Sequence, residues 1–254
     1  MAARTRSRFL TAVGTVIAVL AAVIAALLSG GSPDAAPPQT DARPSAATSH
    51  ATRQPVPPKA AGSGHVHLSL PDAIAALKVE PEHRAGYVRT AFKHWVDADH
   101  DGCNTRAEVL LEEAVTPPAR GTGCRLTGGT WYSPYDDTTV RGPSGLDIDH
   151  RVPLAESWDS GAWQWTAERR EAYANDLGDP RSLLAVTAAS NRSKGDQDPA
   201  DWLPPYQGDR CEYVTDWVVV KTRWSLSIDD AERRTLVQWA GQCPGTVVDV
   251  DRVP

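Results

Sequence analysis

The segment Leu146 to Leu154, which reads LDIDHRVPL, holds the residues whose types are best suited to chemistry. His150 is the only histidine after His100, and Asp149 precedes it directly. A histidine side chain titrates near neutral pH and can take a proton from water, whereas a carboxylate can bind a hard cation. The same pair also occurs in proteins without a catalytic role, so its meaning depends on what the fold brings beside it.

A second polar group, the tetrapeptide NRSK at 191–194, follows the apolar run SLLAV at 182–186. A hairpin followed by a helix would bring the end of the first strand beside the residues after the second. Asp149 and Asn191 could then hold one divalent cation through oxygen atoms, and His150 could take a proton from the attacking water. These are the minimal parts of a one-metal phosphodiesterase.

Several spaced motifs together resemble a known family. The stretch DIDHRVPL…SLLAVTAASNRSKGDQDPADWLPP is similar to HNH endonucleases of the His-Me finger (ββα-metal) class. It more closely resembles secreted actinobacterial HNH proteins, whose domain is also the C-terminal domain of GmrSD-type restriction endonucleases. DGCNTRAEVL, YANDL and CEYVTDWVVVKTRWSL resemble further segments of that family, so the likeness runs from about Tyr87 to Cys243.

The resemblance implies a metal-dependent endonuclease that hydrolyses DNA, with RNA as a further substrate, and without strong sequence specificity. It implies a catalytic set in which His150 is the general base and Asp149 and Asn191 bind the metal, Mg²⁺ or Mn²⁺. It makes four more residues candidates for contact with the substrate: Arg192, Lys194, Arg106 and Asn175. Each of these four could instead be a solvated charge or a helix cap.

One position departs from the family pattern. Many HNH proteins have an asparagine just before the second apolar strand, where this chain has Ser182. The asparagine steadies the loop of the histidine. We therefore expect either that the serine hydroxyl replaces it or that activity is reduced.

An acidic segment, DADHDGCNTRAE, matches the EF-hand calcium loop without a gap. Oxygen ligands at alternate positions and a glycine for the sharp turn are what a hard cation requires. The predicted calcium ligands are Asp97, Asp99, Asp101 and Glu108. A single hand is unusual, and the alternative is that the loop only caps two helices.

Residue patterns predict the elements around these motifs. Residues 71–96 read as helical, 126–150 as β-rich, 155–176 as helical and 182–186 as a strand. The next segment begins as a loop, and Asp198 and Pro199 then favour a helix start. Two helices are expected after Cys211. With the resemblance, the fold class is α+β: a ββα-metal core embedded in a mostly helical domain with two disulfides.

Four cysteines, Cys103, Cys124, Cys211 and Cys243, lie in this region. An even count in an exported chain favours two disulfides, and three pairings are open. Proximity in sequence favours Cys103–Cys124 and Cys211–Cys243. A zinc site is the competing interpretation, but no Cys-x-x-Cys spacing supports it.

The N-terminus predicts export. Three arginines at positions 4, 6 and 8 precede an uncharged run at 9–28, so residues 1–28 are expected to insert in the membrane as a signal peptide or as an anchor. Residues 29–64 are rich in Ala and Pro and read as a disordered linker. Residues 65–254 then form the nuclease domain, secreted or held at the outer face of the membrane. No protein partner is evident.

Charge limits how such a domain can act. Residues 65–254 hold 20 Lys and Arg against 30 Asp and Glu, a net charge of −10, whereas nucleic-acid binders are usually basic. Two other functions therefore stay open. One is a calcium-stabilised extracellular binding module with a decayed HNH core, and the other is a cell-wall hydrolase that uses paired carboxylates. A serine hydrolase is disfavoured because the nucleophile motif is absent.

Overall fold

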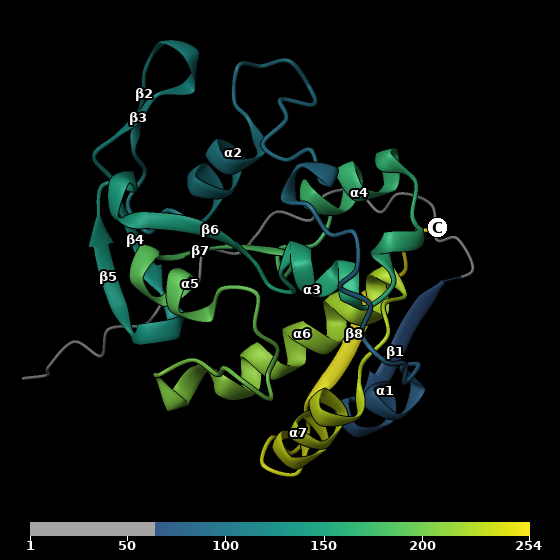
Figure 1. Cartoon of the computed structure of the whole chain (residues 1–254). Coiled ribbons are helices and arrows are strands. Elements are labelled where there is room, and N and C mark those ends of the chain that lie inside the picture. Colours follow the sequence, from purple (N-terminus) through teal and green to yellow (C-terminus); the bar gives the residue numbers. More distant parts are fainter. Residues whose placement is uncertain (1–63) are drawn as a thin grey trace, which may run out of the picture. The chain divides into compact units, whose positions relative to one another are not determined.

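The structure, a computed structural model, describes residues 64–254. Its strands are β1 (His65–Ser69), β2 (Ala119–Arg120), β3 (Leu126–Thr127), β4 (Thr130–Ser133), β5 (Thr138–Arg141), β6 (Leu146–His150), β7 (Leu183–Thr187) and β8 (Val247–Asp251). Its α-helices are α1 (Leu70–Ala76), α2 (Thr105–Glu112), α3 (Leu154–Asp159), α4 (Ala167–Ala174), α5 (Ala188–Lys194), α6 (Arg210–Trp224) and α7 (Asp230–Ala240). The described part is therefore a mixed α and β structure (Figure 1).

The antiparallel pair β6–β7 lies in the middle of the molecule, with α2 on one side and α5 on the other (Figure 1). Its register pairs Leu146 with Thr187 and His150 with Leu183. Because side chains alternate along a strand, Leu146 and Ile148 face one way and join the apolar cluster around Trp131. The other face of β6 is left for polar side chains.

Helix α6 is the centre of the larger apolar cluster. It is buried almost all round, with Val218, Val219 and Val220 consecutive in its middle, as expected for a helix enclosed by other elements. The two-stranded sheet β1–β8 packs on it through Val248 and Val250. Helices α1 and α7 also contact α6, so the two ends of the described chain meet on one core.

The predicted disulfides are confirmed. Cys103 pairs with Cys124 and Cys211 with Cys243, with Cα–Cα distances of 5.0 and 5.6 Å that suit such bridges. The second bridge joins the start of α6 to the segment just after α7. These pairings exclude the cysteine zinc site that was the competing interpretation.

Several predicted elements are confirmed. The β-rich stretch 126–150 contains β3 to β6, the helical stretch 155–176 contains α3 and α4, and the strand at 182–186 is β7. Helices α6 and α7 occupy the two segments expected to be helical after Cys211.

Three expectations were wrong. The predicted helix at 71–96 ends at Ala76, because Pro81 and Gly86 interrupt the following segment and only a single 3₁₀ turn, Arg89–Ala91, forms after them. The loop expected after β7 is the helix α5, capped by Thr187, whose hydroxyl accepts from the Ser190 N–H. No helix starts at Asp198, which instead closes a turn before the two prolines at 204 and 205.

No helix within residues 64–254 is long and apolar enough to cross a membrane. The predicted membrane segment at 1–28 lies outside the described residues, and so does the linker predicted at 29–64, except for Gly64.

We predict that replacing Cys211 and Cys243 together by serine lowers the free energy of unfolding by about 2–4 kcal/mol, because the bridge closes a long loop in the unfolded chain. Urea unfolding of the wild type and of the double variant measures the difference. An unchanged free energy of unfolding, together with reactive thiols in the folded wild type, would contradict this assignment.

Candidate active site

The polar face of β6 presents Asp147 and Asp149, which are two residues apart and therefore point the same way. Helix α5 follows β7 directly and lies over this face. Asn191 Nδ2 is 3.3 Å from Asp147 Oδ2, and Lys194 Nζ is 2.5 Å from Asp149 Oδ2. Because Asn191 and Lys194 are three apart, one face of a single helix supplies both contacts. The structure thus brings Asp149 and Asn191 to one surface, where Asn191 contacts Asp147.

Lys194 is fully buried at this surface. Besides Asp149, its ammonium donates to the His150 carbonyl oxygen over 2.8 Å. Burial lowers the pKa of Lys194 to about 8, and the charge of Asp149 opposes that shift. A buried ammonium is tolerated only when paired, so Lys194 joins α5 to the end of β6. It does not face solvent, and the phosphate contact expected of it stays a prediction.

Tyr135 completes the surroundings of Asp149. Its hydroxyl donates to Asp149 Oδ2 over 2.5 Å and accepts from Arg151 Nη1, and Arg151 pairs with Asp216 on α6 at 2.9 Å. Asp149 accepts one hydrogen bond from Tyr135 and one from Lys194, and both end on Oδ2. No sequence motif pointed to Tyr135.

His150 lies at the end of β6, buried beside the rings of Trp95 and Tyr173. Its Nε2 is 3.0 Å from the carbonyl oxygen of Ala174. A carbonyl oxygen only accepts, so Nε2 carries the proton and Nδ1 keeps its lone pair. Backbone structure thus selects the tautomer, a choice that sequence reasoning did not anticipate.

The burial of His150 also sets its charge. Burial lowers the pKa of His150 to about 4, against the opposing effects of the Ala174 hydrogen bond and of Asp149, and nearby Arg89 lowers it further. The imidazole is therefore neutral at pH 7 and able to accept a proton on Nδ1.

Two residues predicted to contact the substrate form hydrogen bonds to backbone groups in this structure. Asn175 accepts from Val96 N–H and donates to the carbonyl oxygen of Lys93, so it fixes the turn beside Ala174. Arg106 Nη2 donates to the Leu146 carbonyl oxygen over 2.9 Å and holds the start of β6. Their direct contact with substrate stays a prediction.

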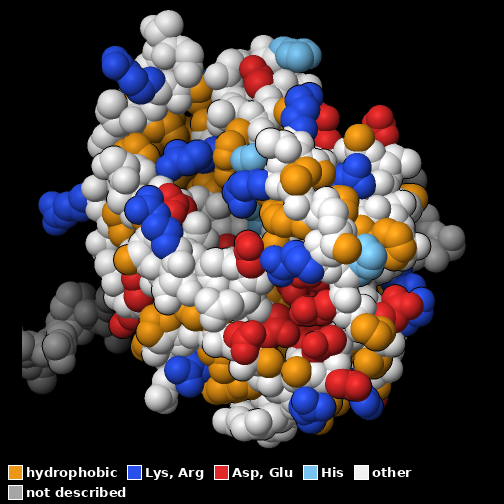
Figure 2. Space-filling model, in the orientation of Figure 1, with side chains coloured by type: hydrophobic (Ala, Val, Ile, Leu, Met, Phe, Trp, Pro, Cys, Tyr) orange, Lys and Arg blue, Asp and Glu red, His pale blue; other side chains and the backbone are white. Residues whose placement is uncertain are grey.

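Arg192 has a different setting, because 76% of its side chain is exposed and its Nε is 3.4 Å from Asp147 Oδ2. Figure 2 shows Lys and Arg side chains around the middle of this face, and Asp and Glu side chains gathered separately below them. Sequence reasoning missed Asp147 as a member of the site and Arg89 as a charge acting on it. Alternation along the strand could have pointed to Asp147.

The sequence of this chain is similar to a known protein and to a known family. The chain is 41% identical over 201 residues to an uncharacterized secreted protein of Arthroderma benhamiae, an alignment that covers 78% of this chain and 96% of the relative. Residues 120–239 match the sequence model of the family described as GmrSD restriction endonucleases, C-terminal domain. Residues 120–239 of the chain belong to this family. No solved structure matches it.

The family match contains β6, β7 and α5, and it gives the chain a domain of the nuclease type. It also covers Ser182, the position that departs from the HNH pattern. Ser182 Oγ donates to Asp176 Oδ2 over 2.8 Å, and the same oxygen accepts from Arg223 and Trp224. The serine hydroxyl therefore helps to hold the turn that follows Ala174. That this hydroxyl also steadies the histidine loop stays a prediction.

The acidic loop lies apart in sequence from these residues. Asp97 Oδ2 accepts from the Gly102 N–H, and Arg120 pairs with Asp101 at 3.0 Å. The carboxylates of Asp97, Asp99 and Asp101 lie within 4.8 Å of one another, and so do those of Asp101 and Glu108. Helix α2 follows the loop, but no α-helix lies directly before it, because the only helical turn in the described residues 77–96 is the 3₁₀ turn Arg89–Ala91. The loop therefore lacks one helix of an EF-hand. Calcium binding stays a prediction.

We predict that lowering the pH from 6.5 to 4 destabilises the fold through His150. Over this range the unfolded chain protonates its histidine while the folded chain does not, so stability is lost as the pH falls towards the folded pKa of about 4. The loss approaches about 3 kcal/mol. Urea unfolding at several pH values should show a steeper loss for the wild type than for His150→Asn. Parallel losses would refute the buried neutral histidine.

We predict that Ca²⁺ raises the midpoint of thermal unfolding, because a ligand that binds only the folded state stabilises it. Asp99→Ala should abolish this increase. Asp137→Asn is a matched control, since Asp137 is an exposed acid in a left-handed conformation that asparagine tolerates. An equal response to Ca²⁺ in wild type and Asp99→Ala would rule the loop out.

Proposed function

We propose that the protein is a metal-dependent endonuclease of the HNH, His-Me finger type that hydrolyses DNA outside the cytoplasm, with RNA as a further substrate. The observation that carries the proposal is a neutral, buried His150 with a free Nδ1, at the end of a strand whose polar face is covered by the helix bearing Asn191. A hairpin followed by a helix is the ββα arrangement of that class. We take residues 65–254 as the nuclease domain.

The donor set suits one hard divalent cation. Asp149 keeps Oδ1 for a cation because its bonds from Tyr135 and Lys194 both end on Oδ2. Asn191 offers its amide oxygen, and Asp147 is a further carboxylate at the same surface. Oxygen donors from carboxylates and an amide match the preference of Mg²⁺ and Mn²⁺. Asp149 and Asn191 would hold the ion, with Asp147 as an additional oxygen ligand.

Each residue then has a defined task. His150 takes a proton from the attacking water on Nδ1, while the Ala174 carbonyl oxygen keeps the ring oriented. Lys194 is buried and positions Asp149 and the end of β6. Exposed Arg192 is free to turn from Asp147 to a phosphate. The metal, when bound, stabilises the negative charge that develops on the phosphate.

The charge of the domain shapes its binding of substrate. A net charge of −10 over residues 65–254 repels a polyanion, so attraction comes from local basic side chains and the cation. We therefore expect weak binding, a strict requirement for divalent cation and little sequence preference.

Two observations support the proposal that the protein acts outside the cell. The relative from Arthroderma benhamiae is named a secreted protein, and this chain carries two disulfides, which persist in oxidising compartments. The alternative of a calcium-stabilised binding module is not favoured, because the family match is to a restriction endonuclease domain.

We predict that the purified protein nicks supercoiled plasmid when Mg²⁺ or Mn²⁺ is present and that a chelator stops the reaction. His150→Ala should lower the rate by about 10²–10⁴-fold, because the general base is lost. Asn191→Ala should raise the metal concentration needed for half-maximal rate.

The matched control is His100→Asn, which removes an exposed histidine whose left-handed backbone asparagine tolerates. It should keep the wild-type rate. A folded His150→Ala that cleaves like the wild type would overturn the assignment of the base. A wild type that stays inert with Mg²⁺, Mn²⁺ and Ca²⁺ would overturn the nuclease proposal itself.

A further inference from the structure

The first and last strands of the described chain carry a second cluster of metal-ligating side chains. In the antiparallel pair β1–β8, His65 lies opposite Asp251 and His67 opposite Asp249. Val248 and Val250 occupy the alternate positions of β8 and pack on the core beneath. The two histidines and two aspartates therefore share the solvent face of one small sheet.

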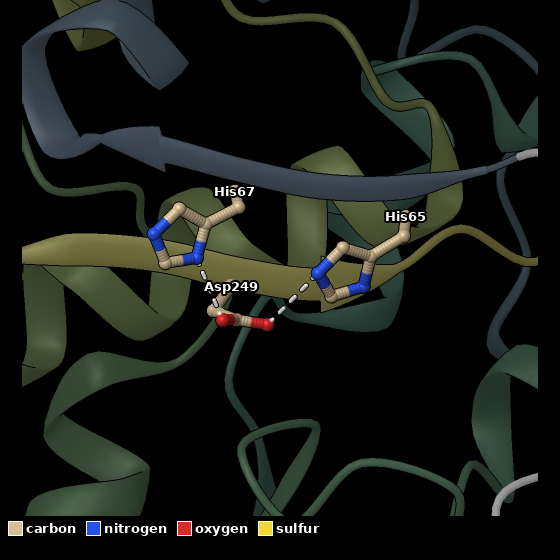
Figure 3. A group of neighbouring side chains, drawn as sticks. All are labelled: His65, His67 and Asp249. Atoms are coloured by element: carbon tan, nitrogen blue, oxygen red, sulfur yellow. Dashed lines mark hydrogen bonds and ion pairs between the residues drawn. The ribbon is translucent and has the colours of Figure 1, made fainter.

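Figure 3 shows both imidazole rings directed at Asp249. His67 Nδ1 is 2.8 Å from Asp249 Oδ2, and His65 Nε2 is 3.4 Å from Asp249 Oδ1. One ligand atom from each of the three side chains lies within 4.8 Å of the others. In a tetrahedral site with bonds of about 2.0–2.1 Å, the ligand atoms are about 3.3 Å apart. The cluster is thus close to the size of a zinc site before any side chain rotates.

A fourth residue orients one of these rings. His65 Nδ1 is 3.0 Å from Asp251 Oδ1, and a carboxylate can only accept there, so Nδ1 carries a proton. Nε2 of the same ring then points towards Asp249 Oδ1. A carboxylate that bonds one nitrogen while the other faces a cation is the usual surrounding of a histidine that binds zinc.

We propose that His65, His67 and Asp249 form a binding site for Zn²⁺, with Asp251 as the outer carboxylate that orients His65. Two imidazoles and one carboxylate suit zinc, whereas Mg²⁺ and Ca²⁺ prefer sites made of oxygen alone. Solvent supplies the remaining ligand, because 51% of the His65 and 65% of the His67 side chain are exposed.

The position of the site gives the ion a structural role. Strand β1 is the first element after residues 1–63, and in the described residues it pairs only with β8. An ion held by both strands pins the start of the domain to its end over the core of α6. Such an ion stabilises the folded state and takes no part in phosphodiester hydrolysis, so the inference is independent of the proposed nuclease.

Titration of the full-length protein with Zn²⁺, in saturating Mg²⁺ and Ca²⁺ to occupy the oxygen sites, tests the proposal. We expect one equivalent of Zn²⁺ to bind tightly and to raise the midpoint of thermal unfolding. Co²⁺ in place of Zn²⁺ should give the visible absorption of a tetrahedral site with histidine ligands.

His67→Ala and Asp249→Asn should each weaken Zn²⁺ binding at least about 100-fold, and Asp251→Asn about 10-fold, as expected for an outer partner. All four side chains are exposed, so the variants should fold like the wild type. His100→Asn, which removes a histidine outside the cluster, should bind Zn²⁺ like the wild type. Either an absence of Zn²⁺ binding in the wild type or unchanged binding in a His65→Ala, His67→Ala double variant would overturn the proposal.

Discussion

The buried ion pair between Lys194 and Asp149 is the interaction on which the candidate site depends. Removing two charges from water is costly, so the pair persists only because other polar groups surround it. Tyr135 donates to the same carboxylate oxygen, and Arg151 links Tyr135 to Asp216 on α6. This series of ion pairs and hydrogen bonds therefore holds the β6–β7 hairpin, α5 and α6 together. Removal of one partner would leave the others buried and unpaired.

Only some parts of this site could be predicted from the sequence. The spacing of Asp149 and Asn191 was sufficient to predict that they come to one surface, because a hairpin brings the end of its first strand beside the segment that follows its second. The chemistry of these two residues and of His150 stays a prediction. Helix α5 was missed because it is short and polar, and Asp136, distant in sequence, helps to hold its start through Thr187. The helix propensity of a seven-residue segment gives no information on such a long-range contact.

Other parts of the fold depended on long-range pairing. Strand β1 pairs with β8 across most of the described chain, and no local pattern at either end indicates a partner. The tautomer of His150 is fixed by the carbonyl oxygen of Ala174, a backbone group that any residue would supply. The same uncertainty affected Lys194, whose type suggested a phosphate contact but whose position is internal. Sequence therefore indicated which residues gather at this surface better than it indicated which way their side chains point.

The two proposed metal sites differ in their ligand atoms. Carboxylate and amide oxygens gather on β6 and α5, whereas imidazoles gather on β1 opposite β8. A crystal soaked with Mn²⁺ tests metal binding at the first of these surfaces most directly, through anomalous scattering. We predict a peak bound by Asp149 and Asn191 on the polar face of β6. Anomalous density confined to the loop of Asp97 to Glu108, with no ion between Asp149 and Asn191, would contradict it.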